Sequence, residues 1–455
     1  MVAVMPGSTT APPITRDAGS LPFPDRPIGT VNEQMPFDHL VVVMMENHSF
    51  DNLLGALSRT RTDVDGLSFD STGEATNSNP GSTGTPPEVT AFPLNTTGQG
   101  ADVSQSWKDT HEQIEGGAMD GFVRSMGSNQ PMGYYTPDAL PFAYSLANTF
   151  TLANRWFCSV PGPTYPNRRF LLAGTAFGGT ATSEAELIHA FEHPPPNGTI
   201  FDALSKHGIP WSNYFSDIPM TMVIPRTIID HLDHHIPIAR FFDDCRTGNL
   251  PAVSFLDPRV GALSKIGKPI ASLPSPFKDL LAEIEADLAS TDSPETQEDP
   301  QDMNPGEAWA HSVIEAVTQS PRWSRTLLIY TYDEHGGYYD HVAPPSAIAP
   351  DNIAPVLQPG DPSGGYDAYG PRVPAIVVSP YSRPGGVSNT VYDHTSVLAT
   401  IESKWNLPAL TNRDANAATV MDFLDLENPA TLLDPPPIQA PSETGPSGPV
   451  PAATG

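Results

Sequence analysis

The sequence has few cysteines and no long hydrophobic run. Its 455 residues include only two cysteines, Cys158 and Cys245. Two thiols exclude a disulfide-stapled scaffold and a zinc site built from thiolates, and they leave open whether the pair is joined or free. The apolar runs, such as residues 40–45, are far shorter than the roughly 18 residues that indicate a transmembrane helix. We therefore expect no transmembrane segment, and residues 1–6 show no signal peptide because they lack a basic and a long apolar region.

Basic residues are also scarce. The chain has 23 Lys and Arg against 52 Asp and Glu, which gives a formal net charge of −29. A surface of this sign repels phosphate backbones, so nucleic acid and anionic lipid are not expected as partners. The 38% of hydrophobic residues is enough for a sizeable core and excludes disorder throughout.

Proline is abundant, with 52 residues, and it marks the ends of the chain. Residues 1–36 are predicted to form an extended N-terminal arm, residues 37–426 the catalytic domain, and residues 427–455 a proline-rich, flexible tail. Residues 66–100 and 289–305 have loop-like compositions, the second of them acidic. No internal repeat is visible.

Between these segments, apolar runs alternate with helical patterns. Residues 37–45, 327–332 and 374–378 are short and continuously apolar, which is typical of strands buried on both faces. Residues 306–320 and 396–405 have helical patterns, the latter after a Thr/Ser cap. We predict an α/β fold with a mostly parallel central sheet and helices on both faces. Ligands bind such sheets beyond the carboxyl ends of the strands.

Acidic residues follow two of the predicted strands directly. Glu46 and Asn47 follow the first strand, and Asp333 and Glu334 follow the second. Two such pairs at one rim can form an oxygen-rich site for a hard cation. Acidic residues after a strand are also common as solvated turns or helix caps, so the spacing alone leaves both interpretations open.

A third segment, residues 161–168 (PGPTYPNR), places Thr164 between prolines. Proline restricts the backbone on both sides, so the hydroxyl is held on a rigid loop. If a cation lowers its pKa, Thr164 can act as a nucleophile, although a structural threonine is the simpler interpretation. Arg168 could bind a phosphate oxygen or pair with a carboxylate.

Six stretches in this order resemble a family of bacterial phosphoesterases. This family includes phosphatidylcholine-type phospholipases C and a respiratory-burst-inhibiting acid phosphatase. The matching stretches are residues 44–51 (MMENHSFD), 117–122 (GAMDGF), 163–168 (PTYPNR), 332–341 (YDEHGGYYDH), 372–380 (RVPAIVVSP) and 393–396 (DHTS). They extend over roughly residues 37 to 416, and their order makes the resemblance specific.

The resemblance implies an alkaline-phosphatase-like fold and hydrolysis of a phosphate ester through a phosphothreonine at Thr164. It implies one divalent metal ion of unspecified identity, with Glu46, Asn47, Asp333 and Glu334 as its ligands. Four imidazoles are candidates for protonating the leaving group or for orienting the carboxylates: His111, His335, His341 and His394. Five residues are candidates for substrate binding: Asn47, Arg168, Asp120, Gln105 and Glu298. The expected substrate is a small phosphate ester or a phospholipid headgroup, and the expected location is extracellular or periplasmic.

The chain departs from the family pattern at two positions. Gln105 stands where relatives usually carry a histidine before Ser-Trp, and residues 297–300 (QEDP) replace an Asp-His-Pro-Pro. The change puts leaving-group protonation and substrate choice in doubt, and a protonated Glu298 could serve as the acid. Loss of catalysis is an alternative, in which the protein only binds a phosphate or choline ligand. A sulfatase or a phosphosugar mutase is a weaker alternative.

Two further groups have simpler interpretations. His231 and His235 would lie on one face of a helix, as in zinc sites, but an exposed polar turn is preferred because no further ligand is identifiable. Five aromatic residues near the motifs could either bind a choline group or belong to the core: Trp107, Phe122, Tyr134, Tyr135 and Trp156.

Overall fold

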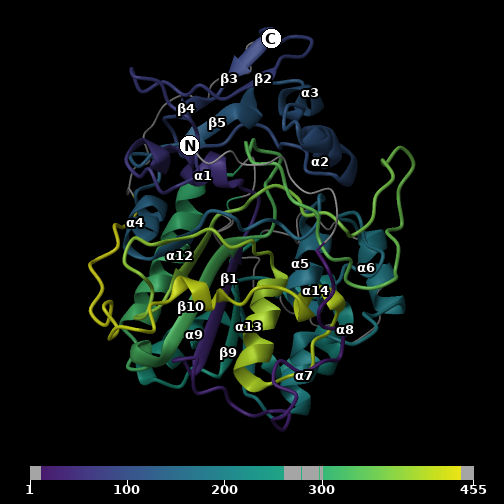
Figure 1. Cartoon of the computed structure of the whole chain (residues 1–455), viewed down its shortest axis with the longest axis vertical. Helices are drawn as coiled ribbons and strands as arrows, with labels where there is room; N and C mark the ends of the chain where they lie inside the picture. Colours follow the sequence, from purple (N-terminus) through teal and green to yellow (C-terminus); the bar gives the residue numbers. More distant parts are fainter. Residues whose placement is uncertain (1–11, 261–277, 279–296, 298–300, 442–455) are drawn as a thin grey trace.

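A twisted β-sheet lies at the centre of the protein, as a computed structural model shows (Figure 1). The structure describes residues 12–260, 278, 297 and 301–441. Within these residues the sheet has eight strands in the order β12-β6-β11-β10-β1-β9-β7-β8. The strands are β1 (His39–Met45), β6 (Thr151–Ala153), β7 (Trp211–Phe215), β8 (His235–Pro237), β9 (Val253–Asp257), β10 (Thr326–Tyr332), β11 (Ala375–Val378) and β12 (Val387–Ser388).

The two central strands confirm the prediction from apolar runs. β1 and β10 pair in parallel from His39 opposite Thr326 to Met45 opposite Tyr332. Almost every side chain of both strands is buried, because helices cover both faces of the sheet. The matched register means that the residues after Met45 and after Tyr332 leave the sheet at the same level.

One strand of the sheet runs against the others. β11 is antiparallel to both β10 and β6, while the remaining pairs are parallel. The residues that precede β11 therefore lie at the rim where the other strands end. The predicted fold class is confirmed: the protein is an α/β protein with a mostly parallel central sheet.

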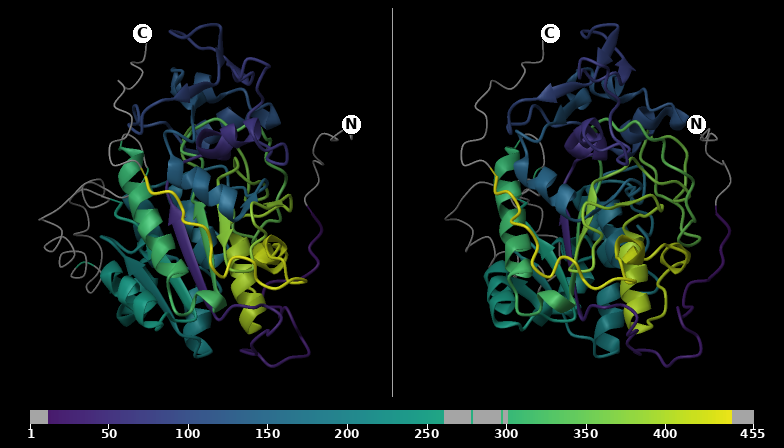
Figure 2. Two further views of the ribbon diagram at one scale, coloured as in Figure 1. Left: turned by 90° about the vertical axis from the view of Figure 1, so that its left-hand side faces the viewer. Right: turned by 60° about the vertical axis from the view of Figure 1, so that its left-hand side comes forward.

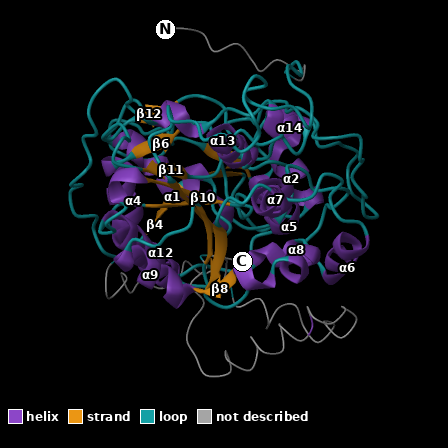
Figure 3. Ribbon diagram, turned by 90° about the horizontal axis from the view of Figure 1, so that it is seen from below, coloured by secondary structure: helices purple, strands orange, loops and turns teal. Residues whose placement is uncertain are grey.

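Helices cover the sheet on both sides, as the view from below shows (Figure 3). One layer contains α4 (Pro141–Thr149), α9 (Ile238–Thr247) and α12 (Met303–Thr318). The other contains α5 (Thr164–Ala173), α6 (Glu184–Glu192), α7 (Ile200–Lys206), α8 (Pro225–Asp230), α13 (Thr395–Trp405) and α14 (Asn412–Ala415). The expected helices at 306–320 and 396–405 are α12 and α13. α13 begins at Thr395 without a side-chain cap, so the expected Thr/Ser cap is wrong.

A small cap lies over the carboxyl ends of the central strands (Figures 1 and 2). It contains α1 (Phe50–Leu54), α2 (Trp107–Ile114) and α3 (Phe122–Met126), and two short strand pairs. These pairs are β2 (Ser78–Pro80) with β3 (Glu88–Thr90), and β4 (Phe92–Leu94) with β5 (Gly133–Tyr135). Residues 66–100 are thus not only loop. Three short strands form there because their edges find partners within the cap.

Both ends of the described chain lie against the body. Asparagine side chains of the α13–α14 region bind the backbone of the N-terminal arm: Asn406 accepts from the amide of Phe23, and Asn416 accepts from the amide of Thr15. At the other end, the Trp323 indole donates to the carbonyl of Leu432 at 3.0 Å. These bonds join both ends of the described chain to residues of the predicted catalytic domain.

Cys158 and Cys245 are both buried and free, so the open question of their pairing is answered. Within the described ranges, no helix is long and apolar enough to cross a bilayer. Glu298 and most of the predicted acidic loop at 289–305 lie outside the described residues.

Candidate active site

The residues after β1 and β10 meet at the carboxyl rim of the sheet. The amide of Asp333 donates to the carbonyl of Met45 at 3.1 Å and thereby continues the ladder by one step. The Asp333 carboxylate accepts from the amides of Asn47, at 3.1 Å, and Glu334, at 2.8 Å. Backbone amides thus fix this carboxylate between the two strand ends, and the two acidic pairs lie at one rim of the sheet.

A glycine turn lets the two strand ends come this close. Gly336 has a φ of 64°, and a Cβ atom there would lie 2.2 Å from the carbonyl oxygen of Asn47. Asn47 itself adopts a left-handed backbone with a φ of 67°, which asparagine tolerates better than most residues. Its buried Oδ1 has no hydrogen-bond partner among the described residues. A buried amide oxygen left in this state is suited to a ligand.

Arg168 lies between the carboxylates of the two strand ends. Its Nε donates to Asp333 Oδ2 at 3.0 Å, and its Nη2 lies 3.6 Å from Glu46 Oε1. All three side chains are buried. Of the two roles left open for Arg168, the structure therefore shows pairing with carboxylates.

Thr164 opens the helix that carries Arg168. It is the first residue of α5, and Arg168 follows one turn later, so both side chains lie on the same face of the helix. Thr164 is 7% exposed, and its hydroxyl makes no hydrogen bond within the described part of the chain. The helix N-terminus also contributes a partial positive charge near this hydroxyl.

The loop before Thr164 is held by the next turn of the helix. Asn167 accepts from the amide of Val160 at 3.1 Å and donates to the carbonyl of Gly162 at 2.8 Å. Ser159 donates to Asp393 at 2.8 Å and ties the loop to the segment before α13. Rigidity at Thr164 was predicted from the prolines, and these bonds add a second source of it.

Two predicted histidines hold the strand end in place. His394 donates from Nε2 to the carbonyl of Asp333 at 2.6 Å, and its Nδ1 faces the Trp156 indole at 3.4 Å. His335 donates from Nε2 to Gln113 at 2.6 Å. Burial lowers the pKa of His394 and lowers the pKa of His335 to about 3, so both rings are neutral at physiological pH. The 3.4 Å contact of His335 Nδ1 with Glu334 is therefore not an ion pair.

His341 belongs to a separate cluster of charges, which we call the Arg372 cluster. This cluster contains Asp51, Asp65, Asp340, His341 and Arg372. Arg372 is fully buried and binds Asp340 through two nitrogens, at 2.9 and 3.0 Å. His341 Nδ1 lies 2.6 Å from Asp51.

Potential metal ligands also occur in the Arg372 cluster. Asp51, Asp340 and His341 form the one group of three acidic, histidine or cysteine ligands within 4.8 Å of one another in the described residues. Arg372 pairs with both carboxylates and His341 pairs with Asp51, so the cluster is explained as ion pairing. Glu46, Asp333 and Glu334 do not meet this distance criterion in the described structure, where Arg168 bridges two of them.

The pKa of His341 gives a testable dependence of stability on pH. The neighbouring Asp51 and Asp65 raise this pKa from 6.5 to about 10, against the opposing effect of burial. The folded state therefore holds a proton that the unfolded state loses above pH 6.5. We expect wild type to exceed His341→Gln in stability at pH 6, and this excess to decrease as the pH rises to 10. Urea unfolding of both proteins across that range measures it, and a constant difference would contradict the assignment.

Three other candidates lie around the edge of the site. His111 is partly buried, donates to the carbonyl of Trp107 at 2.7 Å, and has a pKa lowered by burial. Asp120 is half-buried in the turn before α3, with no contact in the described structure that joins it to Thr164. Gln105 lines a pocket beside the loop of Thr164.

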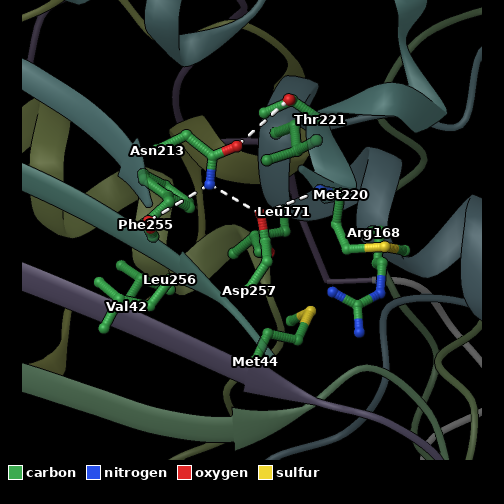
Figure 4. A pocket seen from close by; sticks show the side chains of 11 residues that line it. Val42, Met44, Arg168, Leu171, Asn213, Met220, Thr221, Phe255, Leu256 and Asp257 are labelled. Carbon is green, nitrogen blue, oxygen red and sulfur yellow. Dashed lines mark hydrogen bonds between the residues drawn. The ribbon is translucent and has the colours of Figure 1, made fainter. Parts of the chain in front are cut away.

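Two cavities lie next to α5, and they differ greatly in volume. The cavity around Arg168, Asn213 and Asp257 has a volume of only about 10 Å³, enough for about one water molecule (Figure 4). The pocket at Gln105 has a volume of about 470 Å³, within the usual range for small-molecule sites. Pro163, next to Thr164, lies in its wall together with Trp107, Asp102 and Asp361. This larger pocket is the candidate substrate site.

Comparison with known proteins identifies the chain at the level of a family. A profile described as "Phosphoesterase family" matches residues 37–408. The chain belongs to the phosphoesterase family. It is a hydrolase acting on phosphate esters, as the sequence motifs indicated.

Relatives of the phosphoesterase occur in plants and bacteria. It is 32% identical to "Non-specific phospholipase C6" of Arabidopsis thaliana over 432 residues, which cover 89% of this chain and 75% of the relative. It is 28% identical to "Phospholipase C B" of Mycobacterium tuberculosis, covering 88% and 79%. "Non-hemolytic phospholipase C" of Burkholderia pseudomallei is 29% identical, and the match covers 87% of this chain and 58% of that protein.

Similarity to solved structures is weaker. A protein of the alkaline phosphatase superfamily from Vibrio parahaemolyticus is 12% identical with a TM-score of 0.31, covering 79% of this chain and 77% of that one. Phosphonate monoester hydrolase from Silicibacter pomeroyi is 15% identical with a TM-score of 0.33, covering 75% and 78%. Similarity at these scores adds no argument about the site of the phosphoesterase.

Several residues that support the site of the phosphoesterase were not predicted. Gln113 is buried and joins His335 to the carbonyl of Ser104, next to Gln105 in the pocket wall. His48 is buried between Asn52, at 2.7 Å, and the carbonyl of Gln297, also at 2.7 Å. His48 lies in a quoted motif and Gln297 in the stretch that departs from the family pattern, whereas no local pattern marks Gln113.

The remaining sequence candidates have structural explanations. His231 binds Asp202 and His235 binds Thr221, both at 2.8 Å, so the two imidazoles face different partners, which is consistent with the preferred interpretation of a polar turn. All five aromatic residues near the motifs are buried. Of these five, Trp107 alone lines the pocket at Gln105.

Proposed function

We propose that the phosphoesterase hydrolyses the headgroup phosphodiester of a phospholipid, with Thr164 as the nucleophile. The observation that carries the proposal is the placement of Thr164. It stands at the N-terminus of α5, one turn before the arginine that binds the rim carboxylates, and beside a pocket of about 470 Å³. A rigidly held hydroxyl, on the same helix face as the arginine that binds the buried carboxylates, is the arrangement that a covalent phosphoryl transfer requires.

The residues at the strand ends fit a divalent cation by their chemistry. Glu46, Asp333 and Glu334 provide buried carboxylate oxygens, and Asn47 provides a buried amide oxygen without a partner among the described residues. Hard cations such as Mg²⁺, Mn²⁺ and Ca²⁺ prefer oxygen ligands of this kind. We propose that these four residues hold one divalent ion. When bound, the ion would lower the pKa of the Thr164 hydroxyl and offset charge on the phosphoryl oxygens.

In the reaction, Thr164 Oγ would attack the phosphorus in line with the leaving oxygen. The bond from Oγ to phosphorus forms as the bond from phosphorus to the leaving alkoxide breaks, and the proton of the hydroxyl passes through water to that alkoxide. The product of this step is a phosphothreonine that still carries the headgroup, and attack of water on phosphorus releases the phosphorylated headgroup and restores the hydroxyl. Arg168 keeps Asp333 and Glu46 in position, and His394 holds the backbone of Asp333. His335 and His394 thus act as positioning residues, because their Nε2 protons are already donated inside the protein.

The pocket favours a substrate with a cationic headgroup. Asp102, Asp361 and the Trp107 ring line it, and none of its described lining residues is Lys or Arg. Carboxylates and an aromatic ring together attract quaternary ammonium groups. The plant and bacterial relatives are named phospholipases C, which supports a phosphodiester over a phosphomonoester. An extracellular or periplasmic location fits such a substrate and is part of the proposal.

Two measurements test this function. We expect p-nitrophenyl phosphorylcholine to be hydrolysed with a kcat/KM at least about tenfold higher than p-nitrophenyl phosphate. We also expect EDTA to abolish turnover and a divalent ion to restore it. Preference for the monoester would instead indicate an acid phosphatase, and full activity in EDTA would remove the metal from the proposal. Binding of phosphorylcholine without turnover would support a non-catalytic protein.

A further inference from the structure

The loop between β10 and β11 carries apolar side chains beside the pocket. Ile353, Val356 and Leu357 are 36%, 54% and 37% exposed, and Ala354 between them is exposed as well. Single exposed apolar residues are ordinary on protein surfaces, but here four exposed apolar residues occur within five positions. We call residues 353–357 (IAPVL) the apolar tip. In Figure 1 this part of the chain, in light green, projects from the body near α6.

The apolar tip is fixed to the wall of the pocket through its backbone. The amide of Val356 donates to the carbonyl of Gly178 at 2.8 Å, and its carbonyl accepts from Thr180 Oγ1 at 3.0 Å. Thr180 lines the pocket, and so do Gln358 and Asp361 just after the tip. The backbone is thus tied to the protein while the side chains face outward. Because these bonds join the tip to the pocket wall, the tip keeps a fixed position relative to the pocket.

The charge near the apolar tip indicates which surface it fits. No Lys or Arg occurs between Arg325 and Arg372, whereas Asp351 and Asp361 flank the tip. An anionic membrane attracts proteins through basic residues, and the segment that carries the tip has none. A zwitterionic membrane imposes no such requirement, and apolar side chains enter its interface by hydrophobic burial alone.

We propose that the apolar tip inserts into the surface of a phosphatidylcholine membrane and brings the pocket to the lipid headgroups. This inference extends the proposed function, because it assigns the surface through which the lipid substrate would be reached. Insertion is peripheral and involves a few side chains. The acidic pocket residues would then face the cationic ends of the headgroups.

Vesicle binding tests the proposal independently of catalysis. We compare wild type, the double variant Val356→Asp/Leu357→Asp and the control Leu433→Asp by co-sedimentation with phosphatidylcholine vesicles. Leu433 is also 54% exposed, but it lies on the C-terminal segment and lines no part of the pocket. The double variant should bind vesicles at least about tenfold more weakly than wild type, and the control should match wild type. Turnover of soluble p-nitrophenyl phosphorylcholine should remain unchanged in both variants.

Several results would overturn the proposal. These are equal vesicle binding by wild type and the double variant, stronger binding to phosphatidylglycerol than to phosphatidylcholine vesicles, or a wild-type dimer that the double variant abolishes. Sedimentation velocity detects the last of these, in which a second copy covers the apolar tip. The two proposals fail separately: vesicle binding without hydrolysis of any ester would contradict the proposed function and leave the membrane surface standing.

Discussion

Replacing Thr164 by alanine should reduce kcat/KM by at least about a thousandfold with every phosphate ester. The substitution removes the hydroxyl that opens α5, which is the nucleophile of the proposed mechanism. The fold should persist, because Thr164 donates no side-chain hydrogen bond within the described residues. Steady-state kinetics gives the loss, and thermal unfolding confirms that the variant is folded.

Thr164→Ser is the matched control, because it keeps the hydroxyl and removes only the methyl group. It should retain a substantial part of the activity, and acid quenching of wild type during turnover of p-nitrophenyl phosphorylcholine should leave phosphorylcholine on Thr164. Activity of the alanine variant within tenfold of wild type would end the covalent mechanism. Equal loss in the serine and alanine variants would instead assign Thr164 a role in packing.

Replacing Arg372 by methionine should lower the free energy of unfolding more than any other single substitution proposed for this protein. Arg372 is fully buried, binds Asp340 through two nitrogens and lies 3.3 Å from Asp51. Methionine fills similar space without charge, so Asp340 would remain buried without its cation. Breaking a buried pair in this way costs about 3–5 kcal/mol in the free energy of unfolding. Urea denaturation at pH 7 measures the change.

A surface pair provides the comparison for Arg372. Arg325 also binds an aspartate through two nitrogens, Asp38 at 2.7 and 2.9 Å, but both side chains are well exposed. Arg325→Met should therefore cost less than about 1 kcal/mol. Adding Asp340→Leu to Arg372→Met should recover part of the lost stability, because the unpaired charge is then removed. If both arginine variants lose the same stability, burial of the Arg372 cluster does not determine its contribution.

The parts of the fold that the sequence predicted are those fixed by local patterns. The apolar runs located β1 and β10, because strands covered on both faces must be apolar at every position. The direction of β11 could not be predicted, because an apolar run has the same pattern in a parallel and in an antiparallel strand. The strands in residues 66–100 were missed because each is three residues long and is stabilised by pairing within the cap.

The candidate site was predicted to a similar extent. The meeting of Glu46 and Asp333 follows from two parallel strands that end at one rim. The pairing of Arg168 was left open, because a guanidinium suits a phosphate and a carboxylate equally. The Arg372 cluster was not predicted, because its bonds join residues far apart in the chain, such as Arg372 and Asp51, separated by 321 positions. Contacts between residues so far apart in the chain cannot be predicted from the spacing of residues within a local motif.

The reversed direction of β11 has a consequence for how this enzyme can diversify. Because β11 returns antiparallel to β10, the segment between them leaves and re-enters the sheet at the same rim and needs no crossover connection. The bond between Asp340 and Arg372 closes the segment at its base. Insertions or deletions inside this closed excursion would leave the order of the strands untouched, and loop closure adds little free-energy cost with length. Related enzymes can therefore acquire new substrate ranges through sequence changes in this one segment, while the residues at the catalytic rim stay unaltered.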